Sequence, residues 1–183
     1  GLKASLVQDK VRVDGRLYSV NQLDELPAKC NPISSCVKED VNNMLFFGRY
    51  MPLSNFYTCP FSYQGNTYNC SEQFVQKIKC ETSGYEVTAQ KIMALSNPSH
   101  QKSLGRTIKI DPTWFNSARD IVYPAILAKF AQNDNLMKYL LGTGTKVLAE
   151  ATTDKFWGVG ISLQNSNIMD PNHWTGKNIM GKI

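Results

Sequence analysis

Asn69-Cys-Ser-Glu72-Gln-Phe-Val-Gln76-Lys-Ile-Lys79 is the stretch that most constrains the fold, and it predicts a helix from about residue 71 to residue 81. Side chains at positions i, i+4 and i+7 share one helical face, since each residue turns the helix by roughly 100°. Glu72, Gln76 and Lys79 are therefore expected on one stripe. About 10 Å of helical rise separates Glu72 from Lys79, so the two would not readily pair but could both reach one ligand.

The same stretch also fits a purely structural interpretation. With Asn69 as the N-cap, Glu72 would stand at the third helical position, and Asn-x-x-Glu resembles a capping box that closes the helix end. The carboxylate would then satisfy backbone groups and take no part in chemistry. Both interpretations are compatible with the spacing.

Upstream of this helix the sequence predicts short strands and an N-terminal appendage over residues 1–40. Asp14-Gly15 lies between alternating apolar residues and indicates a hairpin, while Pro27 and Pro32 are typical of the linker that we expect to reach Val41. Further strands are expected at 45–47 and, across the turn Gln64-Gly65-Asn66, at 61–63 and 67–68.

Downstream the pattern is mostly helical. Breaker and cap residues predict helices at 86–95, from Pro98, after Asp111-Pro112 with a kink or a split at Pro124, and at 134–141. Strands are expected at 147–149 and 159–163, followed by a long loop at 165–174. The predicted fold is α+β: one compact, mostly helical domain over residues 41–183 with a small β-sheet.

Composition limits the possible functions. The 183 residues are 42% apolar, enough for one core, and no run approaches the roughly 18 apolar residues of a membrane helix. The N-terminal residues lack the apolar region of a signal peptide, so we expect a soluble intracellular protein, cytoplasmic or nuclear, without membrane association. The five cysteines form no C-x-x-C pair, which predicts reduced thiols and no structural zinc. The net charge of +5 favours an anionic partner.

A second polar cluster follows the strand expected at 147–149. Glu150 and Asp154 precede Trp157, and Gly158 and Gly160 permit close approach to the backbone, so the segment could hold a sugar and a base. Alternatively its polar residues face solvent and Trp157 lies in the core. The segment lacks the glycine pattern of a dinucleotide fingerprint, and neither histidine has metal-ligand or triad spacing, so we predict no cofactor and no metal.

The order and spacing of motifs over residues 46–183 resemble the NADAR family of N-glycosidases. The matching motifs are Phe47-Gly48, Pro52-Leu-Ser-Asn55-Phe56, Tyr68-x-x-x-Glu72-x-x-x-Gln76-x-x-Lys79, Leu104-Gly105-Arg106, Trp114 with Arg119, Lys129-Phe130, Leu141-Gly-Thr-Gly144, Leu148-x-Glu150-Ala-Thr, Asp154-x-x-Trp157-Gly-x-Gly160 and Gly176-x-Asn178-x-x-Gly181. Each motif is weak alone, and the compound pattern is specific.

The resemblance implies a compact α+β fold that cleaves the bond between ribose and a nitrogen. Family substrates include ribosylamino-pyrimidine phosphates and ADP-ribose attached to guanine in DNA, so a ribose-phosphate or ADP-ribosyl N-glycoside, free or on nucleic acid, is the implied partner. The implied catalytic residues are Glu72, Lys79, Trp114 and Asp154, and the implied substrate contacts are Asn55, Gln76, Arg106, Arg119, Glu150, Trp157, Gly158, Gly160 and Asn178. Gln73 departs from the family pattern, which often has histidine there.

Two mechanisms fit such substrates. In one, Lys79 attacks the C1 of a ring-opened glycosylamine and forms a Schiff base while Glu72 moves protons. In the other, Glu72 activates water and Asp154 protonates the leaving nitrogen. Trp114 would stack on the base, or it could be a core residue beneath a helix N-terminus.

Two other functions remain compatible with the sequence. A catalytically silent module could bind ADP-ribose or NAD through the same residues, and only turnover would distinguish it from the enzyme. A general nucleic-acid-binding surface could use Lys102, Arg106, Lys109 and Arg119. Duplex binding of that kind would weaken steeply with salt.

Overall fold

The computed structural model describes residues 4–7, 10–13, 16–19 and 35–183. The chain divides into two compact units, one of residues up to 54 together with 143–182 and the other of residues 55–142. The linker predicted around Pro27 and Pro32 lies outside the described residues.

The unit of residues 55–142 contains one hairpin and all the long helices of the described chain. Its elements are β6 (Phe61–Tyr63), β7 (Asn66–Tyr68), α1 (Ser71–Thr82), α2 (Glu86–Met93), α3 (Pro98–Gly105), α4 (Trp114–Ala131) and α5 (Asp134–Gly142). The predicted hairpin is confirmed, and Gln64 and Gly65 at its turn both have positive φ, of 48° and 75°. This geometry is that of the two-residue turns that suit twisted strands.

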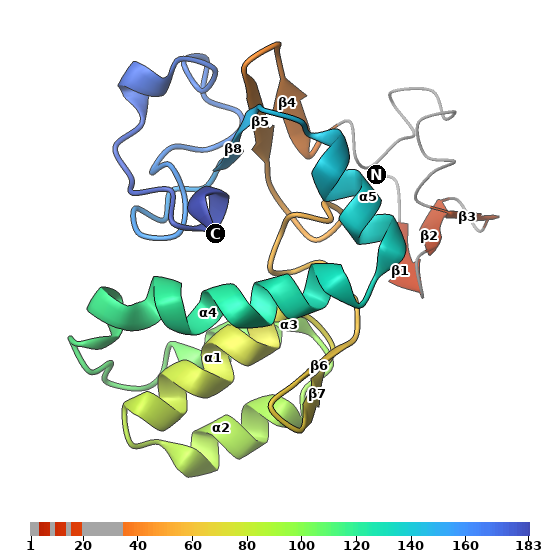
Figure 1. Cartoon of the computed structure of the whole chain (residues 1–183). Coiled ribbons are helices and arrows are strands. Elements are labelled where there is room, and N and C mark those ends of the chain that lie inside the picture. Colours follow the sequence, from red (N-terminus) through yellow and green to blue (C-terminus); the bar gives the residue numbers. More distant parts are fainter. Residues whose placement is uncertain (1–3, 8–9, 14–15, 20–34) are drawn as a thin grey trace. The chain divides into compact units, whose positions relative to one another are not determined.

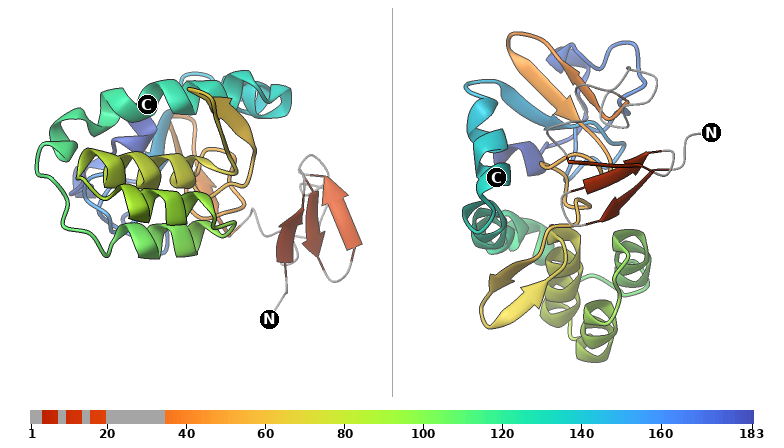
Figure 2. Two further views of the ribbon diagram at one scale, coloured as in Figure 1. Left: turned by 90° about the horizontal axis from the view of Figure 1, so that it is seen from below. Right: turned by 90° about the vertical axis from the view of Figure 1, so that its right-hand side faces the viewer.

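Helix α1 is the central element of this unit. It packs against α2, α3 and α4, and Figure 1 shows it between α4 and α2. Figure 2 shows α1, α2 and α3 packed against one another. Cys80 on α1 joins Ala89, Ile92 and Ile108 in the apolar cluster between them, while Phe74 meets Tyr68 of β7 edge to face at 5.3 Å. These contacts hold α1 on several sides and therefore fix the rotation of the helix about its own axis.

Helix α4 differs from its prediction at both proline-containing sites. It begins at Trp114 after the N-cap Thr113, because Asp111 instead accepts hydrogen bonds from the Thr113 N–H at 2.8 Å and its hydroxyl at 2.7 Å. Of the kink or split predicted at Pro124, the split is wrong, since the helix continues through it to Ala131. A proline removes a single backbone donor, and the buried face of a long helix can offset that loss. No described helix, α4 included, is long and apolar enough to cross a membrane.

The other unit contains two small sheets. The first consists of β1 (Ala4–Val7), β2 (Lys10–Val13) and β3 (Arg16–Ser19), so the predicted hairpin across residues 14–15 is confirmed and β1 is an additional strand. The second has β5 (Asn43–Phe46) in the centre, antiparallel to β4 (Val37–Glu39) and parallel to β8 (Val147–Glu150). Strand β4 lies within the segment for which the sequence predicts an appendage and linker.

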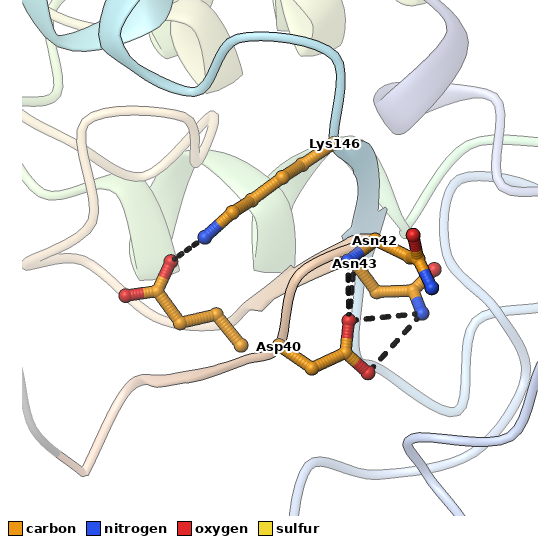
Figure 3. Close-up of polar contacts among 5 residues, drawn as sticks. Asp40, Asn42, Asn43 and Lys146 are labelled. Atoms are coloured by element: carbon orange, nitrogen blue, oxygen red, sulfur yellow. Dashed lines mark hydrogen bonds and ion pairs between the residues drawn. The ribbon is translucent and has the colours of Figure 1, made fainter.

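Polar contacts at one end of this sheet fix the turn between β4 and β5 (Figure 3). The Asp40 carboxylate accepts from the backbone N–H groups of Asn42 at 2.8 Å and Asn43 at 2.7 Å, and these bonds lower the pKa of Asp40. Lys146, just before β8, pairs with Glu39 of β4 at 2.7 Å. These contacts set the register of the sheet from its end.

The strand predicted at 159–163 does not form. Gly160 has a φ of 83°, and the backbone N–H groups of Val159 and Gly160 donate at 2.9 Å to Glu150, the last residue of β8, and to Thr152 just beyond it, so no continuous ladder forms. The apolar residues of this segment are nevertheless buried, because Val159 and Leu163 join the cluster around Leu45. Periodicity therefore identified buried positions but not their backbone geometry. The predicted loop at 165–174 contains the short 3-10 helix η2 (Pro171–His173).

Candidate active site

The N-terminus of α1 is closed by Gln73 and not by Glu72. The N-cap is Cys70, which makes no side-chain cap hydrogen bond. Gln73 Oε1 accepts from the Asn69 N–H at 2.8 Å, and its Nε2 donates to the carbonyl of Leu95 at 3.1 Å. The capping box that the sequence offered for Glu72 is thus wrong. Gln73, the residue that departs from the family pattern, supplies the side chain that accepts from the backbone at the helix start. The Glu72 carboxylate is therefore available for other contacts.

Glu72, Gln76 and Lys79 form a hydrogen-bonded chain along one face of α1, as their spacing predicted. Gln76 Nε2 donates to Glu72 Oε1 at 2.7 Å, and Lys79 Nζ donates to Gln76 Oε1. All three residues are buried, with 3%, 5% and 6% of their surfaces exposed. Gln76 therefore connects two groups that are too far apart along the helix to bond directly.

The protonation of both end groups is shifted by this environment. Burial raises the pKa of Glu72, although Lys102, the hydrogen bond from Gln76, Lys79 and Arg106 oppose the shift. Burial likewise lowers the pKa of Lys79, against the influence of Cys80 and Glu72. Both shifts favour the neutral form, since a charge is costly away from water. In this environment the Glu72 carboxyl can give or take a proton, and the Lys79 amine can act as a nucleophile.

Two basic residues at the C-terminal end of α3, Lys102 within the helix and Arg106 at its C-cap, act electrostatically on this chain. Lys102 and Arg106 are one helical turn apart, and both influence the protonation of Glu72 and Lys79. Neither forms an ion pair with a carboxylate of the described residues. Lys102 Nζ lies 5.3 Å from the ring centroid of Phe56. Lys102, Lys79 and Arg106 all lower the pKa of the one carboxyl of Glu72, an influence suited to binding an anion.

Asn55 meets α1 at Glu72. Its carbonyl accepts from the Glu72 N–H at 2.9 Å, and its own side chain is buried with Oδ1 lacking a hydrogen-bond partner. The Ser71 hydroxyl is the second such group. Unsatisfied buried polar atoms cost free energy, so they commonly mark a place for water or a ligand.

Sequence reasoning placed two further residues of this unit at the site, both on α4. Trp114 is only 2% exposed, which favours the core interpretation over a stacking surface. The Arg119 side chain is exposed and lies 3.4 Å from Asp120. By contrast, the sequence predicted Lys102 only as part of a possible nucleic-acid-binding surface. Its spacing of four residues from Arg106 was the signal that could have placed it at this site.

Two candidate residues of the other unit, Asp154 and Asn178, bond to backbone groups of that unit. Asp154 Oδ1 accepts from the N–H groups of Phe156 and Trp157, both at 2.9 Å. Asn178 accepts from the Glu150 N–H at 3.1 Å and donates to the Leu148 carbonyl at 2.9 Å. These side chains hold the segments after β8 in place.

The glycines of this segment are required by the chain itself. A Cβ on Gly158 would collide with the Thr152 methyl and lie 2.7 Å from the Glu150 carbonyl oxygen. A Cβ on Gly160 would collide with the Thr175 hydroxyl. Trp157 is half-buried and meets Phe156 edge to face at 5.1 Å. Across both units, the described residues include no group of three or more His, Cys, Asp or Glu that could hold a metal ion.

Several known proteins are similar to this chain. An N-glycosidase R617 of Acanthamoeba polyphaga mimivirus is 39% identical over 63% of the chain and 70% of its own length. Protein irg-1 of Caenorhabditis elegans is 31% identical over 63% of the chain and 57% of its own length. The NMR structure of Escherichia coli YbiA, a protein named as an N-glycosidase, matches with a TM-score of 0.61 at 26% identity and covers 86% of this chain and 88% of YbiA.

The sequence pattern of the NADAR domain matches residues 45–183, which agrees with the extent of the motifs found in the sequence. The match contains all of α1 and α3 and therefore every residue of the hydrogen-bonded chain. The α+β fold, with its helices and small sheets, agrees with the structural likeness to YbiA. The chain belongs to the NADAR family.

Proposed function

We propose that this protein is an N-glycosidase that hydrolyses the bond between ribose C1 and an exocyclic nitrogen of a nucleobase-like ring. Relatives named N-glycosidase in a giant virus and in Escherichia coli support a hydrolase acting on N-glycosyl bonds. The substrate that we propose carries ribose-phosphate or ADP-ribose, attached either to guanine, free or in DNA, or to an amino-pyrimidine.

The observation that carries the proposal is the chain from Glu72 through Gln76 to Lys79. A sugar on an exocyclic amine can open its ring, breaking the C1–O4′ bond and forming a C1=N imine. Neutral Lys79 Nζ then adds to C1, and the base leaves as its amine after taking a proton from Glu72. Water adds to the new imine, Nζ leaves, and the released sugar closes its ring. The shifted pKa values of Glu72 and Lys79 favour the protonation states that these steps need.

Direct attack by water is the competing route to the same products. Glu72 would remove a proton from water as it attacks an oxocarbenium-like C1, and Asp154 would protonate the leaving nitrogen. Lys79 would then act only through its charge. The Asp154 Oδ1 atom of that route is bonded to two backbone N–H groups of its own loop, whereas Glu72 and Lys79 are joined by one chain of side-chain hydrogen bonds. We therefore favour the lysine route.

The phosphate of the proposed substrate is supported by the charges on α3. Lys102 and Arg106 have no carboxylate partner among the described residues and stand near Glu72 and Lys79. A phosphate would neutralise this surplus and accept hydrogen bonds from both side chains. The Asn55 Oδ1 atom, which lacks a partner, is a candidate acceptor for a ribose hydroxyl.

Reductive trapping with borohydride tests the proposal. The protein is incubated with an ADP-ribosylated guanosine oligonucleotide, or with a ribosylaminouracil phosphate, and the adduct is located by peptide mapping. We expect the sugar on Lys79, and Lys79→Arg should lose both adduct and turnover because guanidinium is too basic to attack. Lys77→Arg is the matched control, since Lys77 pairs with Glu81 at 2.8 Å.

The other outcomes separate the alternatives. Turnover without an adduct at several reductant concentrations would indicate direct water attack. An adduct on a different lysine would reject the assignment of Lys79. Binding of ADP-ribose without turnover of either substrate would identify a silent module instead of an enzyme.

A further inference from the structure

The carboxamide of Gln76 is fitted against a glycine on the neighbouring helix. A Cβ added to Gly105, the last residue of α3, would collide with Gln76 Oε1 and lie 2.9 Å from Cδ and 3.1 Å from Cβ of the same side chain. Gly105 does not have the positive φ that would itself require glycine. Alanine is favoured over glycine in a helix by about 1 kcal/mol, so the backbone gives no reason for glycine here. The reason for glycine at this position is the space that the Gln76 side chain occupies.

The chemistry of the bridge also demands a carboxamide. Glu72 presents an oxygen that accepts, and Lys79 presents a nitrogen that donates, so the connecting side chain must both donate and accept. Glutamate at position 76 could not donate to an ionised Glu72, and an apolar residue would leave both groups without this contact. The two end groups also fix which way the amide points, with Nε2 toward Glu72.

This bridge leaves part of Glu72 open for chemistry. Gln76 occupies Oε1, whereas Oε2 makes no hydrogen bond to another described residue. A carboxyl held by one oxygen keeps its orientation and can still exchange a proton through the other. The same amide holds Lys79 Nζ at a fixed place along the helix face.

We propose that Gln76 is a positioning residue, not a substrate contact, and that Gly105 provides the space which lets its carboxamide hold Glu72 and Lys79 together. The catalytic consequence of this proposal rests on the proposed N-glycosidase function. The claim that Gly105 makes room for the Gln76 carboxamide does not depend on that function.

The test is a double-mutant cycle between α1 and α3. Gly105→Ala should displace the carboxamide and lower kcat by about 10²-fold with KM changed only a few-fold, because small misplacements of reacting groups are that costly. Gln76→Ala should do the same. If Gly105 acts through Gln76, the double variant will be no slower than Gln76→Ala alone, whereas independent effects would multiply to about 10⁴-fold.

Gly142→Ala is the matched control for the glycine substitution. Gly142 ends α5 as Gly105 ends α3, but nothing lies within 4 Å of its added Cβ. Its variant should keep the activity and the thermal stability of the wild type. An unchanged kcat in Gly105→Ala, or multiplied losses in the double variant, would overturn the proposal.

Titration of Lys79 supplies a readout that does not depend on turnover. In protein with ¹³C at lysine Cε, assigned through Lys79→Arg, the pKa of Lys79 should fall in both single variants, since the ammonium loses an acceptor. It should fall no further in the double variant. The other groups acting on Lys79 are Glu72 and Cys80 on α1 and Lys102 and Arg106 on α3, all of which the variants retain. An unchanged titration would reject the proposal even if no substrate is turned over, while a shared shift without turnover would reject only the function.

Discussion

Glu72 and Asp154 are the two carboxylates that the sequence predicted to be catalytic, and their surroundings differ. Asp154 accepts two backbone N–H groups within its own loop, so its oxygen stabilises a turn. Glu72 is 3% exposed and bonds through its carboxylate to the side chain of Gln76. A carboxylate that accepts from backbone N–H groups stabilises the local fold. A buried carboxyl with a side-chain partner and a raised pKa costs stability and remains able to exchange protons.

The same contrast holds for the amide side chains of the two units. Asn178 bonds to backbone groups of β8 on both its oxygen and its nitrogen. Gln76 bonds with both ends to ionisable side chains. Removing Asn178 would loosen a strand, whereas removing Gln76 would release two reactive groups. These contacts support the proposal that the chemistry is concentrated on α1 and that the segment after β8 provides structure.

Glu72→Gln should produce the largest effect on activity. Glutamine keeps the shape and can still accept from Gln76, but it cannot take a proton, so transition-state stabilisation should fall by about 3 kcal/mol or more, roughly 10² in rate. Steady-state kinetics with the two proposed substrates would measure the loss. Activity within a few-fold of the wild type would show that Glu72 has only a structural role.

Although Glu72→Gln should lose activity, its stability relative to the wild type should increase with pH. Burial raises the pKa of Glu72 in the folded protein. The contribution of Glu72 to the free energy of unfolding is therefore fully present below the pKa of glutamate in the unfolded chain, about 4.3, and is lost as the pH rises through the pKa in the folded protein. Glutamine has no such loss. Chemical unfolding over a pH series should show Glu72→Gln gaining stability relative to the wild type as pH rises from about 4. A constant difference would mean that the carboxylate is not strained by burial.

Gly158→Ala tests the structural half of the comparison. Its Cβ would collide with Thr152 and stand 2.7 Å from the Glu150 carbonyl, so backbone must move, at a cost of about 1–3 kcal/mol. Thr152→Ser removes the colliding methyl but not the carbonyl, and combining the two should recover only part of the stability. A Gly158→Ala variant with normal thermal stability but weak substrate binding would instead identify Gly158 as a contact with the ligand.

Much of the α1 site could be predicted from sequence because helical periodicity is local. The spacing of Glu72, Gln76 and Lys79 placed them on one face, and α1, α2 and α5 begin at the predicted residues, although the cap residue predicted for α1 was wrong. The bridging role of Gln76 and the fit of Gly105 against it could not be predicted, since they depend on the packing of α3 on α1. The strand expected at 159–163 failed for a related reason: the Val159 carbonyl accepts from Thr175 and Gly176, which follow much later in the chain.

Asp154→Asn should have the smallest effect, and for that reason it discriminates most sharply between the two carboxylates. Asparagine keeps the Oδ1 acceptor for the Phe156 and Trp157 N–H groups, so fold and turnover should stay within a few-fold of the wild type. Asp154→Ala removes that acceptor and should cost about 1 kcal/mol of stability, as the loss of a helix cap does. Thermal unfolding and kinetics of both variants separate the roles. If Asp154→Asn remains as stable as the wild type but loses roughly 10² in rate, Asp154 is the acid of the direct water route, and the lysine route through Lys79 would have to be given up.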